Sequence, residues 1–308
     1  MPARVLPFLV LGFGVIVVSF AAILIRFAHA EGASSLAIAA VRLTVAALVL
    51  APFAWSRAGA EMRRLPGREL GLCVLSGALL AVHFWAWITS LEHTSVASST
   101  ALVTTNPLWV ALASAILLRE RPGRAAVAGI LLTLAGSALI FAADASRVAG
   151  LDSAPMLGNV LALAGAVAAS GYLLVGRALR ARVSLVAYIW LAYSTAATLL
   201  LAAAMATGVS FMSLPAAAWG FMVALALGPQ LIGHTTFNWA LRRLTATFVA
   251  VAILGEPVGS ALLADFIFGE HFSALQFAGF VLLLLGIFVA ARGERQMRQE
   301  GARPDQAV

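Results

Sequence analysis

The sequence predicts an all-α integral membrane protein in which ten transmembrane helices form two five-helix inverted repeats. Composition is the first observation, because 62% of the 308 residues are hydrophobic, 11% are charged and the mean hydropathy is +0.98. Only helices or closed barrels bury that much backbone in lipid, and the apolar runs have the length of about 20 residues that a spanning helix needs. The second observation is an internal repeat, and the third is a strong bias in the placement of arginine.

The apolar runs set the expected helices in chain order. They cover residues 5–28, 33–56, 69–91, 95–118, 124–143, 156–179, 184–207, 216–241, 245–268 and 274–292. Residues 1–308 are therefore expected to form a single transmembrane domain. Its first repeat covers about 5–143, its second covers about 156–292, and residues 293–308 form a cytoplasmic tail.

A shift of 150 residues places matching residues of the two halves on each other. The matches include Leu91 with Leu241, Pro107 with Pro257, Glu120 with Glu270, Gly129 with Gly279 and Gly136 with Gly286. Because each half holds an odd number of spans, the second half must enter the membrane from the opposite side. Inverted repeats of this kind are typical of secondary transporters that work by alternating access.

Arginine supplies all 20 basic side chains, and all but three flank the same side of the predicted membrane. The exceptions are Arg26 and Arg147 on the other side and Arg42 inside a span. Cytoplasmic loops carry an excess of basic residues, so we expect both termini in the cytoplasm and the protein in a bacterial inner membrane. The arginines sit at helix ends instead of forming one patch, so the formal charge of +7 predicts no nucleic-acid partner.

Several polar residues fall inside the first repeat's spans, where they are expected to face the bundle interior. His83 and Trp87 share one face of the third helix, and Ser98, Thr105 and Trp109 share one face of the fourth. Each polar group could line a substrate cavity or only hydrogen-bond a neighbouring backbone group. Asn106 precedes Pro107, which is expected to break the fourth helix and act as a hinge.

The second repeat carries a comparable set of residues. Gln230, His234 and Asn238 are spaced four apart and follow a break expected at Gly228-Pro229. Tyr172 of the sixth helix is expected to project toward the same centre, and Pro257 is the hinge that corresponds to Pro107. These residues are expected to bind substrate, although the proline breaks could equally serve packing alone.

Glu256 is the one carboxylate expected deep in the bilayer, and Arg42 is the one arginine. The carboxylate could accept a proton as a coupling ion, bind a cationic substrate group, or pair with Arg42. Arg42 could instead anchor a substrate carboxylate or act as a structural lock. We expect no cofactor and no metal, because Cys73 is the only cysteine and no zinc or phosphate-loop motif occurs.

Four stretches of the first repeat carry a family resemblance: residues 83–87 (His-Phe-Trp-Ala-Trp), 94–99, 105–109 (Thr-Asn-Pro-Leu-Trp) and 118–122. Their partners in the second repeat are residues 234–241, 254–258 and 269–270. With the ten expected spans, these stretches resemble the EamA-like branch of the drug/metabolite transporter superfamily and, more distantly, the YddG-type amino-acid exporters. The resemblance implies a ten-helix carrier for small molecules.

The sequence therefore predicts a secondary transporter, an exporter of a small amphiphilic metabolite, with amino acids or their derivatives as the first candidates. Trp87 and Trp109 would suit an apolar side group, and Arg42 and Glu256 a zwitterionic head. A nucleobase, nucleoside or organic cation is the alternative cargo. A membrane-embedded enzyme or a channel is the alternative class. The oligomeric state is left open.

Overall fold

Helices are the only regular secondary structure in the part of the chain that the computed structural model describes. That part comprises residues 5–93, 99, 102–103, 105–113, 115–116, 122–145, 155–268 and 273–300. Eight of its helices are long and apolar enough to cross a membrane. The expected fourth span, 95–118, lies largely outside the described residues.

The helices of the first half are α1 (Leu6–Ala30), α2 (Ser35–Arg64), α3 (Gly67–His93), α5 (Asn106–Ala113) and α6 (Arg124–Ala145). The second half contains α7 (Pro155–Leu179), α8 (Leu185–Ala206), α9 (Ala216–Leu225), the π-helix η2 (Ala226–His234), α10 (Thr235–Ala240), α11 (Ala246–Ile253), α12 (Gly255–Phe268) and α13 (Ala274–Glu300). Most ends fall within two residues of the sequence expectation. Two helices run eight residues further than expected, to Arg64 and Glu300.

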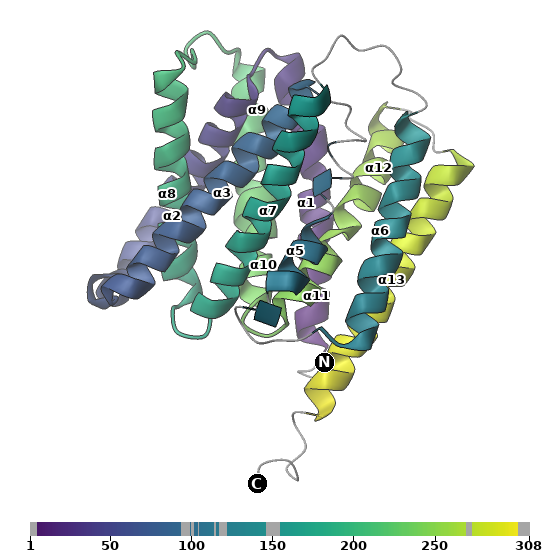
Figure 1. Cartoon of the computed structure of the whole chain (residues 1–308). Helices are drawn as coiled ribbons and strands as arrows, with labels where there is room; N and C mark the ends of the chain where they lie inside the picture. Colours follow the sequence, from purple (N-terminus) through teal and green to yellow (C-terminus); the bar gives the residue numbers. More distant parts are fainter. Residues whose placement is uncertain are drawn as a thin grey trace.

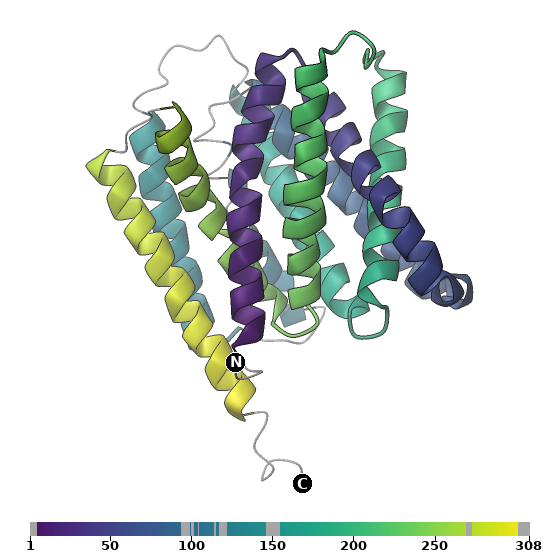
Figure 2. The same ribbon diagram turned by 180° about the vertical axis from the view of Figure 1, so that it is seen from behind.

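The helices form a bundle in which α1 begins and α13 ends at the same end (Figures 1 and 2). Helices α2, α3, α7 and α8 pack together on one side, and α6, α12 and α13 form the other. Between the two groups, α1 contacts both α12 and η2. Helices from both halves of the sequence thus meet throughout the interior.

Helices α6 and α13 make a very close contact through glycine. A Cβ atom at Gly129 would lie 2.7 Å from the carbonyl oxygen of Gly286, and one at Gly136 would lie 2.6 Å from that of Gly279. Gly129 and Gly136 correspond to Gly279 and Gly286 under the 150-residue shift. The contact is therefore reciprocal, as in a two-fold interface where residue i meets j and j meets i. Small residues let membrane helices approach this closely.

Helices α2 and α8 begin in the same way. Ser34 accepts a hydrogen bond from the Ala37 amide, and Ser184, its counterpart 150 residues later, accepts one from the Ala187 amide, each at 3.3 Å. These side chains satisfy amides that a helix start leaves without partners. A glutamate from a neighbouring helix adds a second cap at each start: Glu92 to the Ser35 amide and Glu61 to the Ser184 amide.

Three of the helical stretches are interrupted near proline. Pro229 lies inside η2, where the chain takes a π-helical form between α9 and α10. A proline lacks an amide donor and crowds the preceding turn, and a π-bulge is one way to accommodate such a disruption. Helix α11 ends at Ile253 and α12 begins at Gly255, two residues before Pro257, while α5 begins one residue before Pro107. The breaks expected from the sequence are therefore present.

Candidate functional site

The phenyl ring of Phe84, on α3, lies among polar groups in the bundle interior. The Arg42 guanidinium of α2 sits 4.1 Å above the ring centroid. The His234 imidazole, at the end of η2, meets the ring edge-on at 5.3 Å, and His83 is tilted against it at 4.9 Å. Three predicted site residues from three helices thus converge on one aromatic ring.

Arg42 is only 1% exposed and is incompletely hydrogen-bonded. Its Nε donates to Oε1 of Gln230 over 2.8 Å, whereas Nη1 and Nη2 have no hydrogen-bond partner among the described residues. The surrounding stretch of α2 is apolar, with Ala39, Ala40 and Leu43 all fully buried. Small alanines leave room for a long side chain to cross the interior. A buried cation without a hydrogen-bonded counter-charge is costly, so this arrangement needs a compensating function.

Glu256 lies in the first turn of α12 and is half-buried. Its carboxylate and the Arg42 guanidinium interact electrostatically, but no ion pair within 4.0 Å joins them. In place of Glu256, the protein partner considered for Arg42 from sequence, the structure gives Arg42 the neutral Gln230 side chain. The two opposite charges share the interior and are not locked together.

His83 is held by the backbone of α7. Its Nδ1–H donates to the Gly165 carbonyl oxygen at 3.0 Å, and its ring stacks almost parallel to Trp87, with centroids 6.0 Å apart. Gly165 permits this approach, because a Cβ there would lie 3.3 Å from the Trp87 amide nitrogen. The hydrogen bond fixes the imidazole orientation and leaves the Trp87 indole partly exposed.

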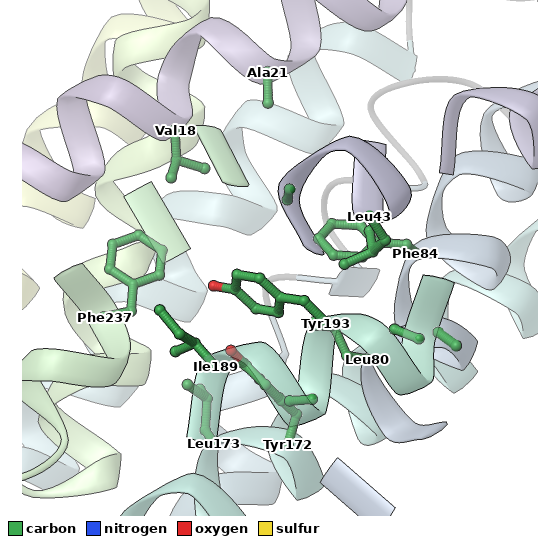
Figure 3. Packing of buried hydrophobic residues seen from close by; sticks show 14 of the residues in the cluster. Val18, Ala21, Leu43, Leu80, Phe84, Tyr172, Leu173, Ile189, Tyr193 and Phe237 are labelled. Atoms are coloured by element: carbon green, nitrogen blue, oxygen red, sulfur yellow. The ribbon is translucent and has the colours of Figure 1, made fainter. Parts of the chain in front are cut away.

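A second polar group surrounds the tyrosines. The Asn238 Nδ2 donates to the Tyr172 hydroxyl at 2.5 Å and to the His234 carbonyl at 2.8 Å, and its Oδ1 is unpartnered. The Tyr193 hydroxyl donates to the backbone carbonyl of Gln230 at 3.5 Å. Figure 3 shows Tyr193 between Phe84 on one side and Phe237 on the other. Tyr193 thus links this group to the cluster around Phe84.

The predicted residues of the fourth helix form a local arrangement. Trp109 Nε1 donates to the Thr105 hydroxyl at 3.0 Å, and that hydroxyl donates to the Leu102 carbonyl at 2.7 Å. Asn106 has a buried, unpartnered Oδ1, and its carbonyl accepts from Ser170 of α7 at 3.2 Å. No described hydrogen bond or ring contact joins these residues to Arg42. Ser98 lies outside the described residues.

Sequence reasoning missed two contributors, Phe84 and Tyr193. An apolar Phe84 within an apolar helix has no distinguishing signature. The tyrosines did offer a signal: the chain has only three, and Tyr172, Tyr188 and Tyr193 are all at most 2% exposed. Buried tyrosines usually need a partner for the hydroxyl. Tyr188 finds it in Ser76, with 2.7 Å between the oxygens.

At the end of the bundle that holds the α7–α8 turn, two arginines bind the end of α10. Arg177 Nη1 donates to the Leu241 carbonyl at 2.8 Å, and Arg180 Nε donates to that of Asn238 at 3.2 Å. Cations stabilise the carbonyl end of a helix. Burial lowers the pKa of Arg180 to about 10, so the side chain is still charged at neutral pH. The described residues contain no group of three histidine, cysteine, aspartate or glutamate side chains that could hold a metal ion.

Comparison with known proteins adds three findings. The EamA-like transporter family matches the sequence twice, over residues 7–142 and 156–292. A "Probable terminal-alkyne amino-acid exporter" of Streptantibioticus cattleyicolor is 29% identical over 266 residues, which cover 85% of this chain and 86% of the relative. A crystal structure at 22% identity has a TM-score of 0.80 and covers 96% of this chain and 99% of its own. At that identity the likeness concerns the fold.

Proposed function

Because the chain belongs to the EamA-like transporter family, whose domain it contains twice, we propose that it exports a small amphiphilic metabolite by alternating access. Amino acids or their derivatives are the first cargo class. The protein is a multi-pass membrane protein, as the family and the apolar helices indicate. The exporter named among its relatives supports both the outward direction and the cargo class.

The proposed mechanism uses ten helices arranged as two inverted repeats of five. The reciprocal contact between α6 and α13 supports it, since equivalent glycines meet crosswise on two antiparallel helices. The matching starts of α2 and α8 support it as well. Pro107 and Pro257 would be the paired hinges, each near the start of a helix that resumes after a break. Two such halves can exchange an outward-open for an inward-open shape.

The cargo assignment depends on one observation. Arg42 and Glu256 have opposite formal charges in an apolar interior, and no ion pair joins the two side chains. Polar and ionisable residues inside a membrane protein commonly mark the path of a substrate or ion. The proposed binding residues are the ones expected from sequence: His83, Trp87, Ser98, Thr105, Asn106, Trp109, Tyr172, Gln230, His234, Asn238 and Glu256. Glu256 would also be the site at which protons couple to transport.

The arginine bias supports a location in a bacterial inner membrane with both termini in the cytoplasm. The α2–α3 and α7–α8 turns lie at the end of the bundle where α1 begins. Arg63, Arg64, Arg177 and Arg180 all lie in or beside these turns. This end would therefore be the cytoplasmic one.

Counterflow in proteoliposomes tests the proposal. Vesicles containing the purified protein are loaded with one unlabelled amino acid, and uptake of the same amino acid in labelled form is followed, with nucleosides and quaternary amines as alternative cargoes. We expect saturable uptake of at least one amino acid that overshoots equilibrium, and none in protein-free vesicles. Overshoot with nucleosides or amines alone would reassign the cargo. Flux that does not saturate would indicate a channel and contradict the carrier mechanism.

A further inference from the structure

We propose that Arg42 is the carboxylate-binding residue of this transporter, with Nη1 and Nη2 holding both oxygens of the substrate carboxylate. This assignment rests on the proposed transport function and specifies the part of the cargo that the protein recognises. It follows from the incomplete hydrogen bonding of the guanidinium and from the positions of the groups around it.

The guanidinium has five N–H donors, and only the one on Nε is used. Gln230 occupies the Nε side, and the Phe84 ring covers one face at 4.1 Å. The edge formed by Nη1 and Nη2 is buried and has no hydrogen-bond partner among the described residues, so it is the part of the guanidinium that a ligand would complete. A planar carboxylate fits that edge through two parallel hydrogen bonds.

The described part of the chain supplies no carboxylate at this edge. Glu256 interacts with Arg42 electrostatically but forms no ion pair with it. A guanidinium in a membrane interior with two of its three nitrogens unpartnered carries a large desolvation penalty. A ligand that provides the missing oxygens removes this penalty, so the substrate is the group that completes the site.

Further unpartnered atoms lie beside the guanidinium. The Nε2 of Gln230 and the Nδ1 of His234 are both buried and have no hydrogen bond to any residue that the structure describes. Gln230 binds Arg42 directly, and His234 contacts the same Phe84 ring as Arg42. The amide Nε2 of Gln230 can only donate, and His234 donates in the tautomer that carries its proton on Nδ1. The groups beside the guanidinium are therefore hydrogen-bond donors, which favour an oxyanion as the ligand.

Glu256 determines the remaining part of the cargo. Arg42 and Glu256 have opposite formal charges, so each end of a zwitterion would meet a charge of opposite sign. Its carboxylate would lie against Arg42 while its ammonium group points toward the half-buried Glu256 side of the site. An amine without a carboxylate would leave the Arg42 edge empty.

Binding of three probes to the full-length protein in detergent tests the proposal. The probes are L-leucine, 4-methylpentanoate, which lacks the amino group, and 3-methylbutylamine, which lacks the carboxylate. Thermal melting and intrinsic tryptophan fluorescence report binding. We expect L-leucine to bind most tightly, 4-methylpentanoate more weakly, and the amine weakest of all, because it makes no contact with Arg42.

Substitution of the guanidinium gives the second readout. Arg42→Gln should weaken L-leucine binding about tenfold to a hundredfold, the loss expected for hydrogen bonds to a charged group, and should not weaken amine binding. The L-leucine affinity of Arg42→Lys should lie between those of the wild type and Arg42→Gln, because lysine keeps the charge without the planar fork. Arg57→Gln is the matched control, since it removes an exposed arginine from the same helix and should bind like the wild type.

The outcomes separate this inference from the proposed function. Equal binding of L-leucine and the amine to the wild type would overturn the role of Arg42, even if Arg42→Gln did not fold. Unchanged L-leucine affinity in Arg42→Gln would overturn it too, while counterflow could persist. If 4-methylpentanoate binds through Arg42 and no amino acid does, the carboxylate site stands and the amino-acid cargo is wrong. If neither carboxylate probe binds, the inference fails.

Discussion

Replacing Gly136 by alanine tests the contact between α6 and α13. The added Cβ would lie 2.6 Å from the Gly279 carbonyl oxygen and 2.7 Å from the Leu283 amide nitrogen. Ordinary contact begins near 3.4 Å, so the helices must separate by about 0.8 Å, and both obstructing atoms belong to the backbone. Overpacking of this kind costs about 1–3 kcal/mol of folding free energy. Gly286→Ala, on the other helix of the same contact, should behave alike.

The matched control is Gly12→Ala in α1, where a Cβ would meet no atom within 4 Å. Both variants gain the same helix propensity, so the difference between them isolates the contact. We expect Gly136→Ala to melt about 2–12 °C below Gly12→Ala, given about 2–4 °C per kcal/mol for a chain of this order of size. Tryptophan fluorescence in detergent measures this, because the chain holds seven tryptophans. Indistinguishable melting temperatures would refute the tight contact.

Two further predictions concern orientation and coupling. In a Cys73→Ser background, Met212→Cys in the α8–α9 connection, where the side chain is 96% exposed, should react with an impermeant thiol reagent outside intact cells. Gly67→Cys, at the α2–α3 turn, should not, and equal labelling of both would contradict the proposed orientation. Glu256→Gln should make substrate affinity independent of pH. In the wild type, affinity should fall as the medium is acidified, because a proton on this carboxylate removes its attraction for the substrate ammonium. A counterflow series from mildly acidic to mildly alkaline pH, with melting as the folding control, decides this; an unchanged pH profile in the variant would show that Glu256 is not the coupling site.

The helices could be predicted because a helix that crosses lipid needs a long apolar run, and such runs can be recognised in the sequence. Helix ends were harder to predict when a helix continues beyond the apolar run. The α2 helix extends to Arg64 because Ala58 and Gly59 are still buried, while Arg57, Arg63 and Arg64 are exposed. Hydropathy decreases at the first charged residues after the apolar run, but the helical backbone hydrogen bonds continue past them.

The site was predictable only in part, because its contacts depend on which helices become neighbours. Polarity inside a span identified Arg42, His83 and Gln230. It did not reveal that Arg42 would bond the neutral Gln230 amide and remain unpaired with Glu256, since opposite charge suggests a pair and only the fold sets the distance. Phe84, around which these groups gather, cannot be told from other apolar residues by sequence.

The π-helical turn of η2 changes how Gln230, His234 and Asn238 are presented. In an uninterrupted α-helix, residues four apart rotate about 40° around the axis at each step, so three of them would wind through about 80°. A π-helical turn holds more than four residues, so the step from Gln230 to His234 rotates in the opposite sense. The next step, within α10, has the ordinary rotation, and the two largely cancel. Gln230 and Asn238 therefore project in nearly the same direction with His234 offset to one side between them, where an α-helix would have set the three on a spiral.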